Sequence, residues 1–163
     1  MKIGFIGCGN VGGKLSYSLL RNGFDLVVRD LDINTAQSLL DEGATWAESP
    51  KQVAESCEVI ITCLPSPAAC KEVMEAPDGV LAGLSEGKVW MEMSTTDETE
   101  VRRMGKLVKE VGAYAVDCPV SGGCHRAATG NISIFVGGER EAFEKIFPIL
   151  TAMGRNILHT GPL

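Results

Sequence analysis

Residues 2–30 decide the fold of this chain. They read KIGFI (2–6), GCGNVG (7–12), a helical pattern up to Asn22-Gly23, and FDLVVRD (24–30). We predict a strand, a glycine-rich turn, a helix and a second strand that ends at an acid. A G-x-G-x-x-G motif alone is weak evidence, because 19 of the 163 residues are glycine. Here the motif follows a strand and opens a helix, which is the context that dinucleotide binding requires.

Each part of this motif has an expected role. Gly7 permits the tight turn, Gly9 lets a pyrophosphate approach the main chain, and Gly12 lets the helix pack closely on the strand. Asp30 follows Gly7 at about the spacing of 20 residues expected for an acid that accepts hydrogen bonds from the adenosine ribose. A carboxylate there favours NAD and repels the 2′-phosphate of NADP. The alternative is a plain β-α-β unit with a solvated acid.

Composition bounds the class of protein. The 163 residues are 45% hydrophobic and 22% charged, which suits one domain with a proper core. The net charge of −6 argues against nucleic acid and anionic membrane as partners. The six cysteines form no C-x-x-C pair and show no zinc-ligand spacing, so we expect no metal site. Their apolar surroundings indicate a reducing, cytoplasmic compartment.

The rest of the chain alternates between strand and helix patterns. We expect strands at 44–46, 58–64, 88–93, 114–117, 131–136 and 155–159. We expect helices at 34–42, from Ser49-Pro50, at 68–75, from a Thr95 or Thr96 cap to Glu110, and at 141–150 with Phe143, Ile146, Phe147 and Leu150 inward. Residues 119–130 are expected to form a loop. This alternation predicts one α/β domain over residues 1–163, a Rossmann-type, mostly parallel sheet with helices on both faces.

One loop combines a hydroxyl with exposed backbone amides. Ser121-Gly122-Gly123 follows a strand, and such a group suits a carboxylate ligand. A simple glycine-rich turn is an equal alternative. No general acid or base stands in a convincing setting, because His125 is a lone loop histidine and Cys124 is more typical of a small packing residue.

Together these segments resemble the β-hydroxyacid dehydrogenase family, which includes 3-hydroxyisobutyrate dehydrogenase and 6-phosphogluconate dehydrogenase. The resemblance spans the chain and lies in residues 4–12, Cys63-Leu64-Pro65, Met93-Ser94-Thr95, 119–123 with Gly130-Asn131, and Val136-Gly137-Gly138. It implies a nicotinamide cofactor and hydride transfer at the hydroxyl-bearing carbon of a short β-hydroxy acid. The site residues that it implies are Gly7, Gly9, Asn10, Val11 and Gly12 at the pyrophosphate, Asp30 and Leu31 at the adenosine ribose, Leu64, Pro65 and Thr95 along the cofactor, and Ser121, Gly122 and Gly123 at the substrate carboxylate.

The chain also departs from this family. The family's catalytic lysine lies on a helix after the first domain, and this chain ends where that helix should begin. We therefore expect no catalytic residue in this chain, an absent all-helical second domain, and a truncated gene product or engineered fragment. The implied partners are a small hydroxy acid, the helical domain and, in the full-length enzyme, a second copy.

Several alternatives stay open. An NADPH-dependent imine reductase shares this first domain and differs in its proton donor. A dinucleotide-binding or interaction module without chemistry is a third possibility. Arg126 stands where the family has a small residue, and it suggests pairing with an anionic substrate group. Apolar surface near the last strand and the Ser121–Gly123 loop predicts self-association of the chain.

Overall fold

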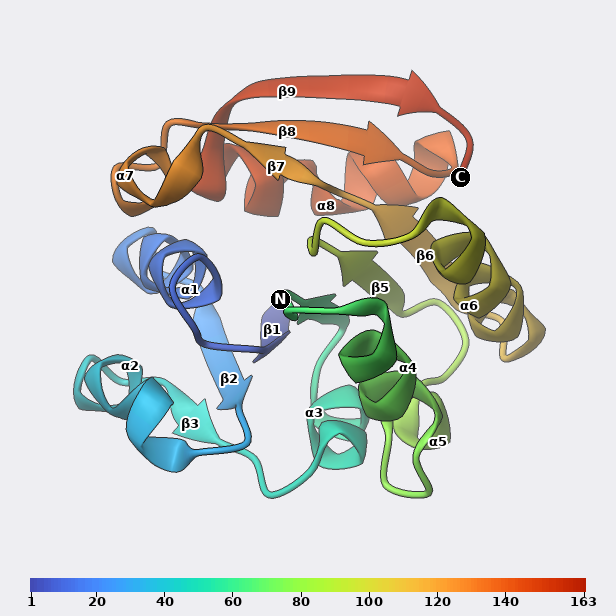
Figure 1. Ribbon diagram of the computed structural model, residues 1–163, viewed down its shortest axis with the longest axis horizontal. Helices are drawn as coiled ribbons and strands as arrows, with labels where there is room; N and C mark the ends of the chain where they lie inside the picture. The colour runs from blue at the N-terminus through green and yellow to red at the C-terminus, as the bar shows by residue number, and fades with distance from the viewer.

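The computed structural model describes residues 1–163 and shows one nine-stranded sheet between two layers of helices (Figure 1). The strand order is β3-β2-β1-β4-β5-β6-β8-β7, with β9 paired to β8. The first six strands are parallel, and their order is typical of dinucleotide-binding sheets. The strands are β1 (Lys2–Ile6), β2 (Asp25–Arg29), β3 (Thr45–Trp46), β4 (Val59–Thr62), β5 (Val89–Glu92), β6 (Tyr114–Asp117), β7 (Val120–Ser121), β8 (Ile132–Gly137) and β9 (Gly154–Gly161). The prediction of a mostly parallel Rossmann-type sheet is confirmed.

The helices connect these strands across both faces. They are α1 (Gly12–Arg21), the 3-10 helix η1 (Ile33–Ala36), α2 (Gln37–Asp41), α3 (Pro50–Ser56), α4 (Pro67–Glu75), α5 (Val80–Gly83), α6 (Glu98–Glu110), α7 (Gly123–Ala128) and α8 (Arg140–Met153). The predicted cap of α3 is confirmed, because the Ser49 side chain accepts a hydrogen bond from the Gln52 amide at 3.1 Å.

Three local predictions were wrong. Asp97, not Thr95 or Thr96, caps α6, since its carboxylate accepts from the Glu100 amide at 3.1 Å. Residues 119–130 are not one loop, because β7 pairs with β8 and α7 follows it. Phe147 is 45% exposed, because it lies at the edge of the buried stripe of α8, where Ile149 and Met153 take the inner positions.

Two separate cores lie on the two faces of the sheet. Side chains from β1 that alternate along the strand divide between them: Ile3 and Phe5 join the core under α1, α2 and α8, and Ile6 joins the core under α3, α4 and α6. The central strands are buried on both faces, which explains their continuous apolar sequence. None of the helices combines the length and apolarity needed to traverse a bilayer.

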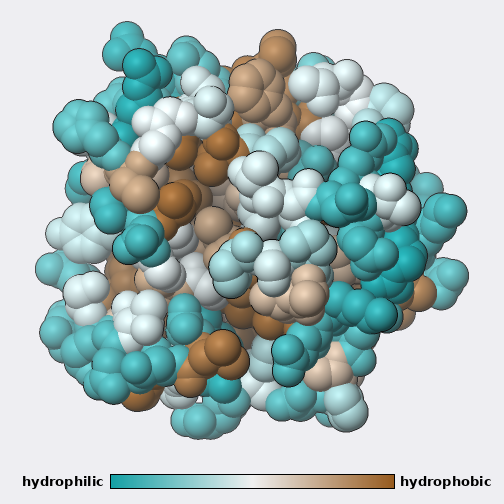
Figure 2. Space-filling model, in the orientation of Figure 1, coloured by the Kyte–Doolittle hydropathy of each residue, from teal (hydrophilic) through white to brown (hydrophobic).

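An apolar patch remains exposed on the outer strands. Phe135 of β8 and Leu158 of β9 are register partners and are 41% and 57% exposed. Brown side chains gather over these two strands at the upper edge of the face in Figure 2. This surface lies where the sequence predicted exposed apolar area.

Candidate dinucleotide site

The turn after β1 brings bare main chain to the edge of the sheet. Gly7 adopts a φ of 97°, and a Cβ on Gly12 would lie 1.9 Å from the Gly7 carbonyl oxygen, so α1 rises directly from the turn. A Cβ on Gly9 would meet no atom within 4 Å, so the main chain there is open. No side chain caps α1, and the Asn10 and Val11 amides have no acceptor within the chain. An anion at the positive end of the helix dipole can therefore accept hydrogen bonds from these amides.

Asp30 is held in place beside this turn. Its Oδ2 accepts a hydrogen bond from the Cys8 amide at 2.7 Å, and its Oδ1 accepts from the Leu31 amide at 2.7 Å. Each oxygen keeps a second acceptor position for a ligand hydroxyl. The neighbouring Arg29 guanidinium lies 5.0 Å from the centre of the Trp46 ring, which gives this cation a partner of its own.

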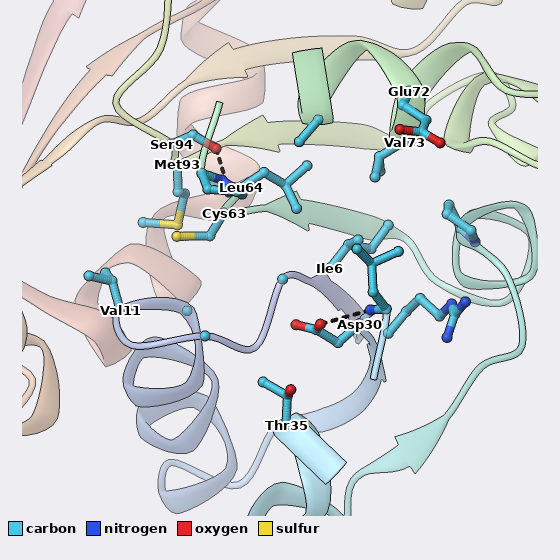
Figure 3. A pocket seen from close by; sticks show the side chains of 18 of the residues that line it. Ile6, Val11, Asp30, Thr35, Cys63, Leu64, Glu72, Val73, Met93 and Ser94 are labelled. Atoms are coloured by element: carbon cyan, nitrogen blue, oxygen red, sulfur yellow. Dashed lines mark hydrogen bonds between the residues drawn. The ribbon is translucent and has the colours of Figure 1, made fainter. Parts of the chain in front are cut away.

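The turn and the acid open into one cavity of about 690 Å³. It lies at the carboxyl ends of β1, β2, β4 and β5, where the strand order reverses between β1 and β4. Figure 3 shows Asp30 pointing into it opposite Leu64 and Ser94. All of the residues expected at the cofactor line it, namely Gly7, Gly9, Asn10, Val11, Gly12, Asp30, Leu31, Leu64, Pro65 and Thr95.

The predicted carboxylate loop lies beside this cavity and not in its wall. Val120 lines the cavity, and Ser121, Gly122 and Gly123 follow it as exposed residues. Gly122 has a φ of 134° and a Cβ there would lie 2.7 Å from Cδ of Arg126, so the arginine stem packs over bare backbone. The structure thus brings together the residues expected at the cofactor and leaves residues 121–123 at the rim of the cavity.

The two cysteines nearest the turn, Cys8 and Cys63, stay protonated at neutral pH and so are poor nucleophiles. Burial raises the pKa of Cys8 to about 12 and the pKa of Cys63 to about 12. Neither a lysine nor a histidine lines the cavity. The open main-chain amides and the Asp30 carboxylate of these walls can bind and orient a ligand.

A buried acid behind the cavity wall was not predicted from the sequence. Glu92 ends β5 with 0% exposure, and its Oε1 accepts from the Ser94 amide at 2.7 Å. The Thr62 hydroxyl donates to its Oε2 at 2.9 Å, and the Trp90 indole N–H donates to Thr62 at 2.9 Å. The Ser94 hydroxyl oxygen in turn accepts from the Leu64 amide at 2.7 Å, as Figure 3 marks. The only signal was an acid inside an apolar strand pattern.

More of the cavity wall comes from segments distant in the sequence. Its remaining lining residues include Thr35, Pro50, Glu72, Val73, Ala76, Asp78, Met93 and Ser94. Those from α3, α4 and the segment after α4 carry no motif of their own. Only the packing of α3 and α4 on the sheet brings them to the cavity.

Comparisons with known proteins agree with this geometry. A sequence model of the NAD-binding domain of 6-phosphogluconate dehydrogenase matches residues 2–161. The NAD-dependent L-serine dehydrogenase of Pseudomonas aeruginosa is 37% identical over 99% of this chain and 54% of its own length. A probable mitochondrial 3-hydroxyisobutyrate dehydrogenase of Dictyostelium discoideum is 35% identical over 98% of this chain and 50% of its own length. The chain thus spans about half the length of the curated relatives it matches.

Solved structures share the fold closely. Psf3 in complex with NADP+ and 2-OPP superimposes with a TM-score of 0.94 at 29% identity, over 98% of this chain and 56% of Psf3. An imine reductase from Pseudomonas sp. has the same fold, with a TM-score of 0.87 at 23% identity over 99% of this chain and 56% of that protein. The open glycine turn, the acid after β2 and the match over residues 2–161 lead to one conclusion: this chain belongs to the family of NAD-binding domains named after 6-phosphogluconate dehydrogenase.

Proposed function

We propose that this chain binds NAD in the cavity and serves as the cofactor domain of a dehydrogenase that acts on a short β-hydroxy acid, of the 3-hydroxyisobutyrate dehydrogenase type. The observation that supports this most is the opening at Gly9 beside the fixed Asp30 carboxylate, in one cavity. The turn offers amides to a diphosphate, and the acid offers acceptors to a ribose.

The strand order supports one direction for the bound cofactor. With the adenosine ribose at Asp30 and the diphosphate at residues 9–12, the nicotinamide would lie toward Met93, Ser94, Thr95 and Val120. NAD supplies the hydride acceptor when bound. The residues of this chain hold the cofactor in one orientation and cover it with the apolar walls of the cavity.

We propose that NAD is preferred to NADP. Both Asp30 oxygens are fixed by main-chain amides, so the carboxylate cannot turn away from a 2′-phosphate, which it would repel. Arg29 also lines the cavity and lies over the Trp46 ring, so the proposed preference rests on the Asp30 carboxylate alone. The cofactor differs among similar proteins, since the L-serine dehydrogenase is NAD-dependent and Psf3 holds NADP+.

In this proposal the substrate is bound by residues at the rim of the cavity. Ser121, Gly122 and Gly123 would hold the substrate carboxylate beside the nicotinamide end, and Arg126 would meet a second anionic group. Their position next to Val120, which lines the cavity, supports this role. The proton acceptor would come from a lysine outside this chain. An imine reductase is the alternative enzyme, and a non-catalytic nucleotide-responsive module is the alternative without chemistry.

The exposed pair Phe135 and Leu158 supports two further parts of the proposal. In a longer parent protein an all-helical domain would cover this patch, and the full-length enzyme would be a homo-oligomer. We also propose a reducing, cytoplasmic compartment, which suits the six free cysteines.

The proposal is tested by titrating the chain with NADH and with NADPH and following nicotinamide fluorescence. We expect saturable NADH binding and NADPH binding that is at least about tenfold weaker, which corresponds to about 1.4 kcal/mol. Tighter binding of NADPH than of NADH would reverse the cofactor preference and favour the imine reductase reading. No binding of either nucleotide would overturn the proposed function.

A further inference from the structure

Behind the nicotinamide end of the cavity lies a buried acid without a cation. The Glu92 carboxyl is 0% exposed and takes part in no ion pair of the chain. Its Oε1 accepts a hydrogen bond from the amide of Ser94, a residue that lines the cavity and whose hydroxyl oxygen accepts from the Leu64 amide. A negative charge at Glu92 would therefore act on a ligand across one residue of protein.

We propose that Glu92 sets the relative affinity of the cavity for the oxidised and the reduced nicotinamide. This inference rests on the proposed function, which orients the nicotinamide toward Ser94. The oxidised ring carries one positive charge, and the ring becomes neutral when it gains a hydride. A carboxylate behind the wall attracts only the oxidised form, and so it lowers the Kd of NAD+ relative to that of NADH.

The surroundings make this attraction large enough to measure. The side chain lies on the face of the sheet whose core contains Trp90, Cys70 and Met74, which are fully buried. Two unit charges about 10 Å apart at an effective dielectric constant of about 20 change a binding constant by about tenfold. Solvent screening is weak there, because the carboxyl has no access to water.

The hydrogen bonds around Glu92 are compatible with either charge state. The Thr62 hydroxyl can donate to the carboxylate, or turn toward the Met91 carbonyl oxygen at 3.5 Å and accept from a protonated Glu92. Burial raises the pKa of Glu92, while hydrogen bonds from Ser94 and Thr62 act in the opposite direction. The negative charge, and with it the preference for NAD+, therefore grows as pH rises.

The other titratable groups around Glu92 are few. Cys70 of α4 and Cys63 after β4 have pKa values raised to about 12, and burial also raises the pKa of Cys118, so these thiols stay neutral. Asp117 of β6 is the register partner of Glu92, and burial together with the charge of Glu92 raises its pKa to about 6. At pH 8.5 Asp117 is ionised, so a comparison there isolates Glu92.

The test measures both Kd values at pH 8.5, NADH by its fluorescence and NAD+ by displacement of NADH. We expect the ratio Kd(NAD+)/Kd(NADH) to be about tenfold higher in Glu92→Gln, which keeps the size of the side chain and removes its charge. Glu92→Asp, which keeps the charge, should stay near the unaltered ratio. Trp90→Phe removes a donor from the same hydrogen-bond chain without changing charge, and it should shift both Kd values together.

The outcomes separate the two proposals. If both nucleotides bind and Glu92→Gln leaves the ratio within about twofold, this inference is wrong and the proposed function stands. If the unaltered chain binds neither nucleotide, both the proposed function and this inference are wrong. Should Glu92→Gln not fold, Glu92→Met decides: it removes the charge and suits the apolar surroundings, and a ratio within about twofold of that of the unaltered chain overturns the inference.

Discussion

Replacement of Gly9 by alanine tests the binding site apart from the fold. A Cβ at Gly9 would meet no atom within 4 Å, and the residue has no positive φ, so the change introduces no clash or strain. We expect the free energy of unfolding to stay within about 0.5 kcal/mol of the unaltered value. The methyl group would instead occupy the space through which a diphosphate reaches the Asn10 and Val11 amides.

The size of the loss follows from those amides. A hydrogen bond from a neutral amide to a charged group contributes about 1.5–3 kcal/mol, so the loss of one raises the Kd of NADH by about tenfold or more. Fluorescence titration with NADH measures this change, and urea unfolding measures stability on the same samples. Unchanged NADH affinity in Gly9→Ala would refute the placement of the diphosphate at this turn.

Gly12→Ala is the matched control for that variant. Its Cβ would lie 1.9 Å from the Gly7 carbonyl oxygen, so α1 must move away from the turn. We expect a loss of stability of about 1–3 kcal/mol, the usual cost of overpacking. Gly9→Ala should thus weaken NADH binding at unchanged stability, whereas Gly12→Ala should lower the stability of the fold.

Further predictions concern the acid after β2, the acid after β6 and the apolar patch. Asp30→Asn should weaken NADH and strengthen NADPH binding, so that the ratio of their Kd values shifts by about tenfold toward NADPH; an unchanged ratio would show that another group sets the preference. Because burial raises the pKa of Asp117 from 3.8 to about 6, its ionisation costs stability as pH rises through this window. Asp117→Asn should therefore raise the free energy of unfolding by about 1–2 kcal/mol at pH 7.5 and change it little at pH 4, as urea unfolding at both values would show. The chain should self-associate at high concentration through Phe135 and Leu158, and the double serine variant should be more monomeric in sedimentation; a monomeric unaltered chain would contradict this.

The local pattern predicted much of the lining of the cavity. Motif residues such as Gly7, Gly9 and Asp30 could be assigned roles because their spacing is fixed by one strand, one turn and one helix. The structure lines a single cavity with every residue expected at the cofactor. The same local reasoning misplaced the cap of α6. Thr95, Thr96 and Asp97 are all possible caps, and it is the Asp97 carboxylate that accepts the hydrogen bond from the Glu100 amide.

By itself, the sequence determined the alternating order of strands and helices, the parallel sheet and the first turn, because each depends on periodicity or on residues close along the chain. Only the tertiary structure decided how far the cavity extends under α3 and α4 and that the Ser121–Gly123 loop stays at its rim. It alone showed how Glu92 is buried beside Thr62 and how Ser94 meets Leu64, since these two hydrogen bonds join residues 30 positions apart in the sequence. Hydrogen bonds between segments distant in sequence leave no periodic trace, and so the buried acid could be found only in the folded chain.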